Sequence, residues 1–298
     1  MRALAIGGLT ALLAVSAVAG ELRIEQGTDS VRVLRGDTLL TQYKTGPEQK
    51  YPYFYPVNGP TSGESVTTES SRPFPHHQSL FFGCDFVNGG NFWQDSNARG
   101  QIVSQGTAVE VEQSDVVRFR DTCLWQIPGE EPIIRDERVF VVRELGEDAW
   151  ALDVDIRLHA LTDIHIRKTN HSLFSARMRP ELSVESGGTM VNAEGALNAE
   201  GTHGEPSAWC DASGTRDGIT EGLAIFDHTG NPWHPSPWFT RDYGFLSPTP
   251  LYWFEEGYGI PQGEVLHLRY RVVVHAGDAE EARIAERYAE WAAETNGE

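Results

Sequence analysis

The stretch VFVVRELGEDAWALDVDIRLHA, residues 139–160, indicates the fold class. Apolar and polar residues alternate on both sides of the turn signal Glu147-Asp148. We expect one buried face that carries Val139 and Val141 before the turn and Leu152, Val154, Ile156 and Leu158 after it. Alternation over this length is typical of long antiparallel strands with one face buried.

The same alternation recurs along the chain. It predicts further strands over residues 101–113, 115–127, 132–145, 149–161, 222–227 and 264–275. Residues 30–35 and 38–43 flank Gly36-Asp37, a pair that predicts a hairpin with a type II′ turn. About ten strands curl or split when they form one open sheet, so the sequence predicts two packed sheets.

One helix is predicted, at the C-terminal end. Asp278 precedes Glu281 by three positions, as in an acidic variant of the capping box. Ile284, Tyr288 and Trp291 then recur at helical spacing, so one face of the helix is expected to dock on a sheet. The predicted fold is all-β: a large antiparallel β-sandwich with one C-terminal α-helix.

The first 19 residues are expected to be a secretory signal rather than part of the fold. A short positive start, an uncharged apolar run over residues 4–18 and the A-x-A site Ala17-Val18-Ala19 support this. The alternative is an anchor that is retained, but the run is short for a membrane span. We expect residues 20–298 to form a single domain that is periplasmic or secreted, with no membrane association after cleavage.

The charge and the cysteines restrict the partners. The formal net charge is −19 and the chain has only three lysines, which disfavours nucleic acid and anionic lipid as partners. An oxidising compartment would permit one disulfide among Cys84, Cys123 and Cys210. The alternative, preferred for at least one of the three, is a buried small side chain. The sequence does not indicate an oligomeric state.

Four long segments without a clear strand pattern are expected to be binding loops. They span residues 44–74, 88–100, 187–218 and 228–263, and they hold most of the Trp and Tyr residues. Such loops would gather above the sandwich and form a pocket.

Three stretches carry the candidate chemistry. His76 and His77 follow Pro73 and Pro75, which are expected to hold the chain extended and to direct the two rings to opposite sides. In FSARMRPEL, residues 174–182, Arg177 and Arg179 share a face, with Glu181 and Asp211 as candidate partners. WHPSPWFTRDYGF, residues 233–245, combines aromatic rings with an arginine and a carboxylate, a set that suits a carbohydrate. For each stretch the alternative is a purely structural role.

No motif calls for a cofactor. The sequence has no G-x-S-x-G, no catalytic-cysteine signature, no phosphate loop, no dinucleotide fingerprint and no H-E-x-x-H. No metal ligands are assigned, although four histidines could converge in space, namely His76, His77, His171 and His234.

Several motifs together resemble a known family. YPYFYPVNGP, PHHQSLFF, VNGGNFW, RPEL, GLAIFDHTGNP and WFTRDYG occur in this order between residues 51 and 244. As a set they resemble the bacterial family often labelled methane oxygenase PmoA, whose members are exported. The resemblance implies a β-sandwich similar to the galactose mutarotase supersandwich and work on carbohydrates. It does not imply a subunit of the membrane monooxygenase, because such subunits span the membrane several times.

The chain departs from that family at three places. It has His76-His77-Gln78 where the family commonly reads H-H-R, and Phe82-Gly83-Cys84-Asp85-Phe86 where the family has F-A-H-G-D. It has Trp238-Phe239 where the family has W-H. Activity would be altered or lost if those histidines bind metal or move protons.

The leading hypothesis is an enzyme on a sugar or oligosaccharide, a hydrolase, lyase or epimerase. The predicted catalytic residues are His76 or His77 as acid/base, with Asp242 or Glu181 as the carboxylate partner. The predicted substrate-binding residues are Asn88, Trp93, Arg177, Trp209, His234, Trp238, Arg241 and Tyr243. The alternatives are a non-catalytic carbohydrate-binding protein and, third, a metal-dependent oxygenase.

Overall fold

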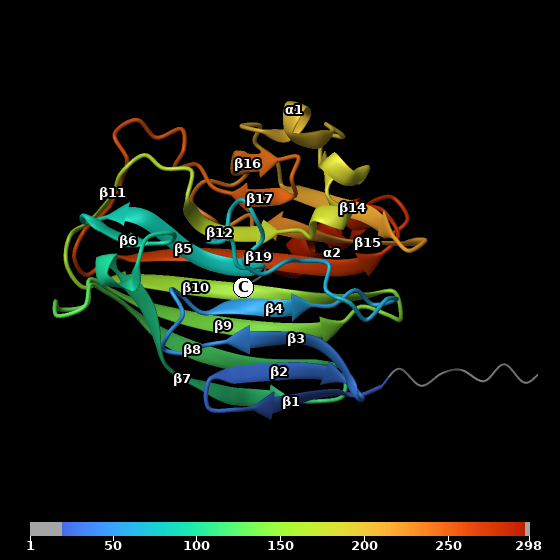
Figure 1. Ribbon diagram of the computed structural model, residues 1–298, viewed down its shortest axis with the longest axis horizontal. Helices are drawn as coiled ribbons and strands as arrows, with labels where there is room; N and C mark the ends of the chain where they lie inside the picture. The colour runs from blue at the N-terminus through green and yellow to red at the C-terminus, as the bar shows by residue number, and fades with distance from the viewer. Residues whose placement is uncertain (1–19, 296–298) are drawn as a thin grey trace, which may run out of the picture.

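Two antiparallel sheets pack face to face in a computed structural model that describes residues 20–295 (Figure 1). The predicted signal, residues 1–19, lies outside the described residues. One sheet has 11 strands. Its main path runs in the order β1 (Leu22–Gln26), β2 (Ser30–Arg35), β3 (Thr38–Lys44), β4 (Tyr53–Val57), β5 (Leu80–Val87), β12 (Ser172–Arg177), β17 (Phe245–Pro248) and β16 (Trp238–Arg241). Three short strands join it off this path: β6 (Gly90–Phe92), β11 (Ile164–Ile166) and β18 (Tyr258–Ile260).

The second sheet has 8 strands, among them the five longest of the described chain. Its order is β13 (Thr189–Asn192), β14 (Trp209–Arg216), β15 (Ile219–Asp227), β19 (Val265–Ala276), β10 (Ala149–Ala160), β9 (Ile134–Glu144), β8 (Val116–Gln126) and β7 (Gln101–Glu112). The sandwich and the strands predicted from the alternating pattern are therefore confirmed, with ends that differ by at most two residues except at β15, which begins three residues before the predicted start. The turn at Gly36 is also present, with the positive φ of 56° that the first central position requires.

The register of β9 and β10 corrects one part of the predicted pattern. Phe140 lies opposite Val154, and Val141 lies opposite Asp153. Residues opposite each other share a face, so Phe140 and Val142 face the core with Leu152 and Val154. The expectation that Val139 and Val141 share this face was wrong. The length of the β9–β10 connection sets this register. It places Val139 and Val141 on the outer face, opposite Asp155 and Asp153 of β10.

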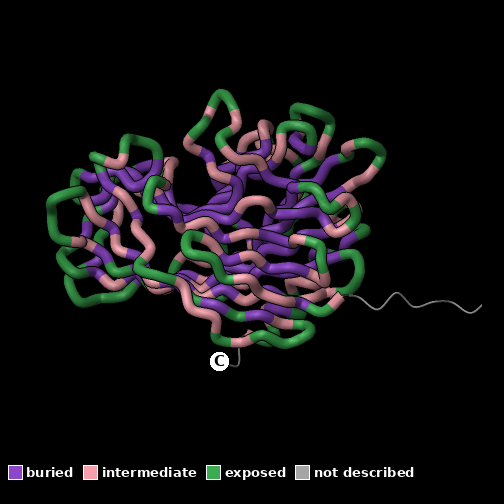
Figure 2. The backbone as a smooth tube through the Cα atoms, turned by 60° about the horizontal axis from the view of Figure 1, so that its bottom comes forward, coloured by how far each residue is buried: buried purple, intermediate pink, exposed green. Residues whose placement is uncertain are grey.

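The core lies between the sheets, where buried backbone is concentrated while the exposed residues lie mostly on loops (Figure 2). Aromatic rings from both sheets meet there: Tyr43 of β3 lies 4.8 Å from Phe54 of β4 and 4.8 Å from Phe140 of β9. These contacts join the two sheets through apolar surface, whose removal from water stabilises the sandwich.

A buried ion pair lies among these rings. Arg138 and Asp136 of β9 have side chains 1% and 0% exposed, and Arg138 Nη2 lies 2.5 Å from Asp136 Oδ2. The indole N–H of Trp125 donates to the same carboxylate oxygen at 3.0 Å. A charge at this depth is tolerated only when it is paired, so the two residues depend on each other.

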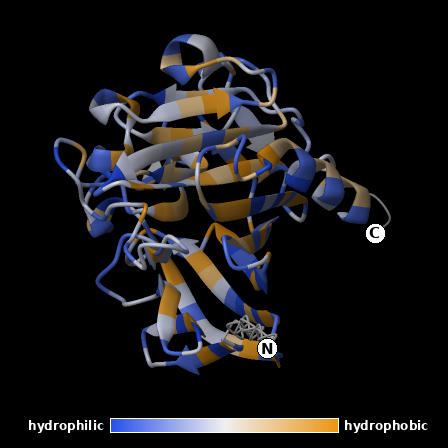
Figure 3. Cartoon of the chain, turned by 90° about the vertical axis from the view of Figure 1, so that its right-hand side faces the viewer, coloured by the Kyte–Doolittle hydropathy of each residue, from blue (hydrophilic) through white to orange (hydrophobic). Residues whose placement is uncertain are grey.

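The helix α2 (Ile284–Thr295) covers part of the outer face of the 8-stranded sheet (Figure 3). Trp291 packs on Phe226 of β15, with ring centroids 5.8 Å apart. The predicted capping box is present, since Asp278 Oδ1 accepts from the N–H of Glu281 at 3.0 Å and Glu281 accepts from the N–H of Asp278 at 3.2 Å. The box caps a turn before α2, because Arg283 has a φ of 55° that interrupts the helical backbone. The described chain also contains a short helix, α1 (Asn198–Thr202), and three 3₁₀ turns (Asn97–Arg99, Pro180–Leu182 and Val184–Ser186).

The segments predicted as loops contain more regular structure than expected. Strands β4, β6, β13, β14, β16, β17 and β18 lie within them or overlap them. Cys84, Cys123 and Cys210 are all free and buried, so the permitted disulfide does not form among them and each is a small core side chain. In the described part of the chain, no helix has both the length and the apolar character needed to cross a membrane.

Candidate functional site

His76 and His77 lie in a turn rather than in an extended segment. The N–H of His77 donates to the carbonyl of Phe74 at 3.0 Å, which places Pro75 at the second position of a β-turn, where proline is favoured. The two imidazole rings lie 4.5 Å apart at 82°, so they do not point to opposite sides as expected. The turn brings both histidines to the same place.

A third histidine joins them from a distant part of the chain. His171 precedes β12, and its neighbour Ser172 pairs with Cys84 of β5 in the sheet. The ring of His171 lies 5.5 Å from that of His76. One nitrogen from each of His76, His77 and His171 lies within 4.8 Å of the other two, and we call this set the histidine cluster.

A buried carboxylate orients His171. Asp85 of β5 is 0% exposed, and its Oδ2 lies 3.1 Å from Nδ1 of His171. The hydroxyl of Thr169 also donates to Asp85, and Gln94 Nε2 lies 3.2 Å from the same carboxylate. The contact with Asp85 occupies Nδ1 of the His171 ring and fixes its orientation, so Nε2 is the nitrogen left for another partner.

Aromatic side chains surround the cluster. Trp93 lies 5.7 Å from His171, and Phe245 of β17 lies 4.6 Å from His77. Tyr243 lies 6.2 Å from His77 on another side, and the guanidinium of Arg177 lies 4.3 Å above the Tyr243 ring. Water is thereby largely excluded from the deeper part of the site.

Four buried nitrogens in this region have no hydrogen-bond partner. They are His76 Nε2, His77 Nδ1, Trp93 Nε1 and Arg177 Nε. Native proteins leave few buried polar atoms unpaired, because each costs about 1–3 kcal/mol. Four unpaired nitrogens on side chains linked by ring contacts indicate a place where a bound group supplies the missing hydrogen-bond partners.

Burial keeps the imidazoles uncharged. Desolvation, with the neighbouring His171, lowers the pKa of His76 to about 4. Desolvation, with His76 and Arg177 nearby, lowers the pKa of His77 to about 2. At neutral pH both side chains are therefore neutral and can bind a ligand through a lone pair, and His76 is the stronger base of the two.

A cavity of about 320 Å³ adjoins the cluster. His76, which belongs to the cluster, and Trp93, which packs against His171, both line this cavity. This volume is within the range of small-molecule sites. Its remaining walls combine two tyrosines with polar and charged side chains: Tyr51, Tyr53, Glu48, Gln49, Lys50, Glu69, Ser70, Gln78, Gln94, Asp95 and Asn97. The hydroxyl of Tyr53 donates to Glu69, and this bond holds the two side chains in place in one wall of the cavity.

Of the residues predicted to form the site, five come together here: His76, His77, Trp93, Arg177 and Tyr243. Sequence reasoning assigned no role to Asp85 or Gln94 and named His171 only as a residue that could converge on a metal. The contacts that hold them link positions about 80 residues apart, and no local motif marks such pairs.

The two predicted carboxylate partners make their described contacts elsewhere. Glu181 pairs with Arg179 at 3.3 Å at the surface, and Asp242 Oδ1 accepts from the N–H of Ala199 at 2.8 Å. The carboxylate that contacts the cluster is Asp85.

The contacts of the other five predicted residues also lie outside the cluster. Arg241 donates to His203 at 2.9 Å, and the buried indole of Trp238 donates to the carbonyl of Ser207 at 2.9 Å. His234 lies 3.3 Å from Asp227, and the amide of Asn88 donates to the carbonyl of Asp163 at 2.8 Å. Trp209 packs beside α2 and lines a separate hollow.

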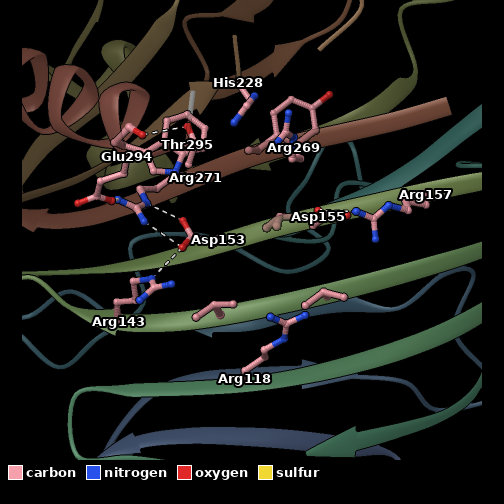
Figure 4. A pocket seen from close by; sticks show the side chains of 15 residues that line it. Arg118, Arg143, Asp153, Asp155, Arg157, His228, Arg269, Arg271, Glu294 and Thr295 are labelled. Carbon is pink, nitrogen blue, oxygen red and sulfur yellow. Dashed lines mark hydrogen bonds and ion pairs between the residues drawn. The ribbon is translucent and has the colours of Figure 1, made fainter. Parts of the chain in front are cut away.

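A second hollow, of about 390 Å³, lies on the outer face of the 8-stranded sheet beside α2 (Figure 4). Its charged walls combine three carboxylates, Asp153, Asp155 and Glu294, with five arginines, Arg118, Arg143, Arg157, Arg269 and Arg271. Asp153 pairs with both Arg271, at 2.5 Å, and Arg143, at 3.0 Å. We call it the arginine groove. It is larger than the cavity beside the histidine cluster, but its charges are mostly compensated by ion pairs. It holds one unpaired buried nitrogen, His228 Nε2, whereas four lie in and around the histidine cluster.

Comparison with known proteins finds one family and several distant structures. The model of a family of unknown function, DUF6807, matches residues 30–289. No curated protein matches the chain. The family carries no assigned activity, so the oxygenase label remains a resemblance of motifs.

Several solved structures are similar to the chain over most of its length, at TM-scores of 0.37 or below. A heparan sulfate lyase mutant from Pedobacter heparinus is similar over 87% of this chain at 9% identity and a TM-score of 0.36, although the chain spans only 36% of the lyase. A protein described as an aldose 1-epimerase from Klebsiella pneumoniae is similar over 91% of this chain and 87% of its own, at 8% identity and a TM-score of 0.37. An aldose epimerase homologue from C. elegans is similar over 88% of this chain and 99% of its own, at 9% identity and a TM-score of 0.33.

Proposed function

The chain belongs to the DUF6807 family, whose function is unknown, and we propose from the geometry of its site that it binds a neutral sugar beside the histidine cluster and acts on it there. The observation that carries the proposal is that two of the four unpartnered buried nitrogens, His76 Nε2 and Trp93 Nε1, belong to residues that line the cavity. A polyhydroxylated ligand offers several acceptor and donor oxygens at once, which suits such a set.

The walls of the cavity favour a sugar over an apolar ligand. Tyr51, Tyr53 and Trp93 present rings that suit the C–H faces of a pyranose, as aromatic side chains do in binding sites with one apolar and one wet side. Amides and carboxylates lie beside them and can accept or donate hydrogen bonds to hydroxyls.

The charge of the walls favours a neutral sugar over a uronate. Three carboxylates, Glu48, Glu69 and Asp95, line the cavity with one lysine, Lys50. The ammonium of Lys50 already donates to the carbonyls of Ser96 and Gly100. Glu69 is paired with Lys44 at 2.6 Å and Asp95 with Arg99 at 3.8 Å, so an anionic ligand would find no free cation among the side chains that line the cavity.

The reaction that we propose is hydrolysis, elimination or epimerisation. The neutral imidazole of His76 lines the cavity and is available as a proton acceptor, His77 lies behind it, and Asp85 orients His171 beside them. The alternative is a binding protein without turnover, which the aromatic walls would serve equally well. We also propose export to the periplasm or beyond.

The test is a titration of the full chain with neutral mono- and disaccharides, and in parallel with glucuronate and galacturonate. We expect a neutral sugar to bind, and at about 100 times its dissociation constant to stabilise the fold by about 2.7 kcal/mol, which is measurable as a rise in Tm. Binding of uronates alone, or of none of these sugars, would contradict the proposal.

A matched pair of variants locates the binding. Gln49→Ala removes an amide of the cavity wall whose buried Oε1 has no hydrogen-bond partner, and it should weaken sugar binding by about threefold to tenfold, the value of one hydrogen bond. Gln105→Ala removes an amide on β7 that does not line the cavity and should leave the affinity unchanged. Equal effects of the two variants would place the sugar elsewhere.

A further inference from the structure

We infer that His76, His77 and His171 bind one divalent first-row transition-metal ion, with Zn²⁺ as the reference ion. One nitrogen of each residue lies within 4.8 Å of the other two, so small rotations of the side chains bring all three to a common ion. The site goes beyond the sugar proposal, and it can be tested without any sugar.

Two of the three ligand nitrogens are identified by their lack of partners. His76 Nε2 and His77 Nδ1 are buried and make no hydrogen bond. His77 is 2% exposed, so water from the bulk does not satisfy it. A buried acceptor without a donor costs free energy, and a bound cation removes that cost by taking the lone pair.

The third ligand, His171, is oriented by a carboxylate, as histidine ligands commonly are in metal sites. Asp85 Oδ2 contacts Nδ1 of His171 at 3.1 Å, which leaves Nε2 for the ion. Metal-bound histidines almost always make such a bond from the second nitrogen, because it fixes the tautomer and raises the basicity of the ligand. Asp85 is a positioning residue in this arrangement. Gln94 and Thr169 in turn hold Asp85.

The ligand set defines the class of ion. Three imidazoles suit zinc, copper, nickel or iron, whereas calcium and magnesium require oxygen ligands. With three protein ligands, a tetrahedral ion keeps one position open, as catalytic zinc sites do. His76 lines the sugar cavity, so that open position would lie at its inner end. A water bound there would have a lowered pKa and would serve as nucleophile or base.

Calorimetric titration of the chelator-treated full chain with ZnCl₂ tests the inference, with CaCl₂ as the parallel arm. We expect one Zn²⁺ per chain with a Kd below about 1 μM and no binding of Ca²⁺ at the same concentrations. Co²⁺ in place of Zn²⁺ should show the visible absorption of a four-coordinate ion. Absence of Zn²⁺ binding, or binding of Ca²⁺ alone, would overturn the inference.

Three variants show where the ion binds. His171→Ala should weaken Zn²⁺ binding by at least about 100-fold, because one of three ligands is lost, and Asp85→Asn should weaken it by about 10- to 100-fold with the stoichiometry kept. His165→Ala, an exposed histidine on β11, is the matched control and should change nothing. Far-UV circular dichroism confirms that each variant is folded. Binding that survives both His171→Ala and Asp85→Asn would show an adventitious surface site.

The two proposals fail in different ways. Zn²⁺ is titrated in the absence of sugar, and sugar is titrated into the chelator-treated chain. Sugar binding without Zn²⁺ binding would contradict the metal site and leave the proposed sugar site standing. Zn²⁺ binding without sugar binding would contradict the sugar site and leave the metal site standing.

Discussion

Alanine at His76 is expected to lower the turnover of the sugar by about 100- to 10,000-fold, the range that a positioned acid/base group supplies. His76 is the one member of the histidine cluster that lines the cavity, so its loss removes the group nearest to the ligand. If His76 binds a metal ion instead, the loss of a ligand gives a decrease at least as large. Binding of the sugar should weaken much less, because the aromatic and amide walls remain.

The measurement is the rate of product formation from the sugar identified by titration, together with the Kd of that sugar. His165→Ala is the control, since it is exposed on β11 and does not line the cavity. Unchanged turnover in His76→Ala would remove the cluster from the reaction. Tight sugar binding by the wild-type chain with no turnover in any buffer would favour the binding protein.

Methionine at Arg138 is expected to lower the free energy of unfolding by about 3–5 kcal/mol. Asp136 is 0% exposed and would keep its charge among the aromatic rings of the core with only the Trp125 N–H as a strong partner. The uncompensated carboxylate, not the lost volume, causes the loss, because methionine fills much of the space of the arginine stem.

Urea unfolding of three variants checks this. Arg135→Met, on the same strand, breaks an ion pair with Glu137 whose side chains are 46% and 38% exposed, and should cost at most about 1 kcal/mol. Adding Asp136→Asn to Arg138→Met should recover part of the stability, since the buried charge is then gone. A cost below about 1 kcal/mol for Arg138→Met would show that the buried pair does not matter to the fold.

The strands were predictable where the pattern alone determines them. Alternation identified the long strands β8 to β10 and β19 because each buries one face along most of its length, and it identified β7 although only Ile102 of that strand is buried. The side on which Val139 and Val141 lie was not predictable in the same way, because it depends on the parity of the β9–β10 register. Short strands such as β17, in which every residue is buried, and β4, whose burial follows no period of two, have no alternation to read.

The site was predictable in its composition but not in its connections. His76, His77 and Trp93 stand close in sequence, so their clustering was visible. Their arrangement depends on a turn at Pro75 that was read as extended chain, and on the contact between Asp85 and His171 across neighbouring strands. The aromatic residues of 233–245 stood out in the same way, yet Trp238 serves the core.

The most direct test of the central claim is the position of a bound sugar in a crystal of the chain soaked with the neutral sugar that binds. We predict the sugar in the cavity between Tyr53 and Trp93, with hydroxyls within hydrogen-bonding distance of His76 and with Gln94 at its mouth. A sugar bound only in the arginine groove (Figure 4), or in the hollow beside Trp209, would contradict the account.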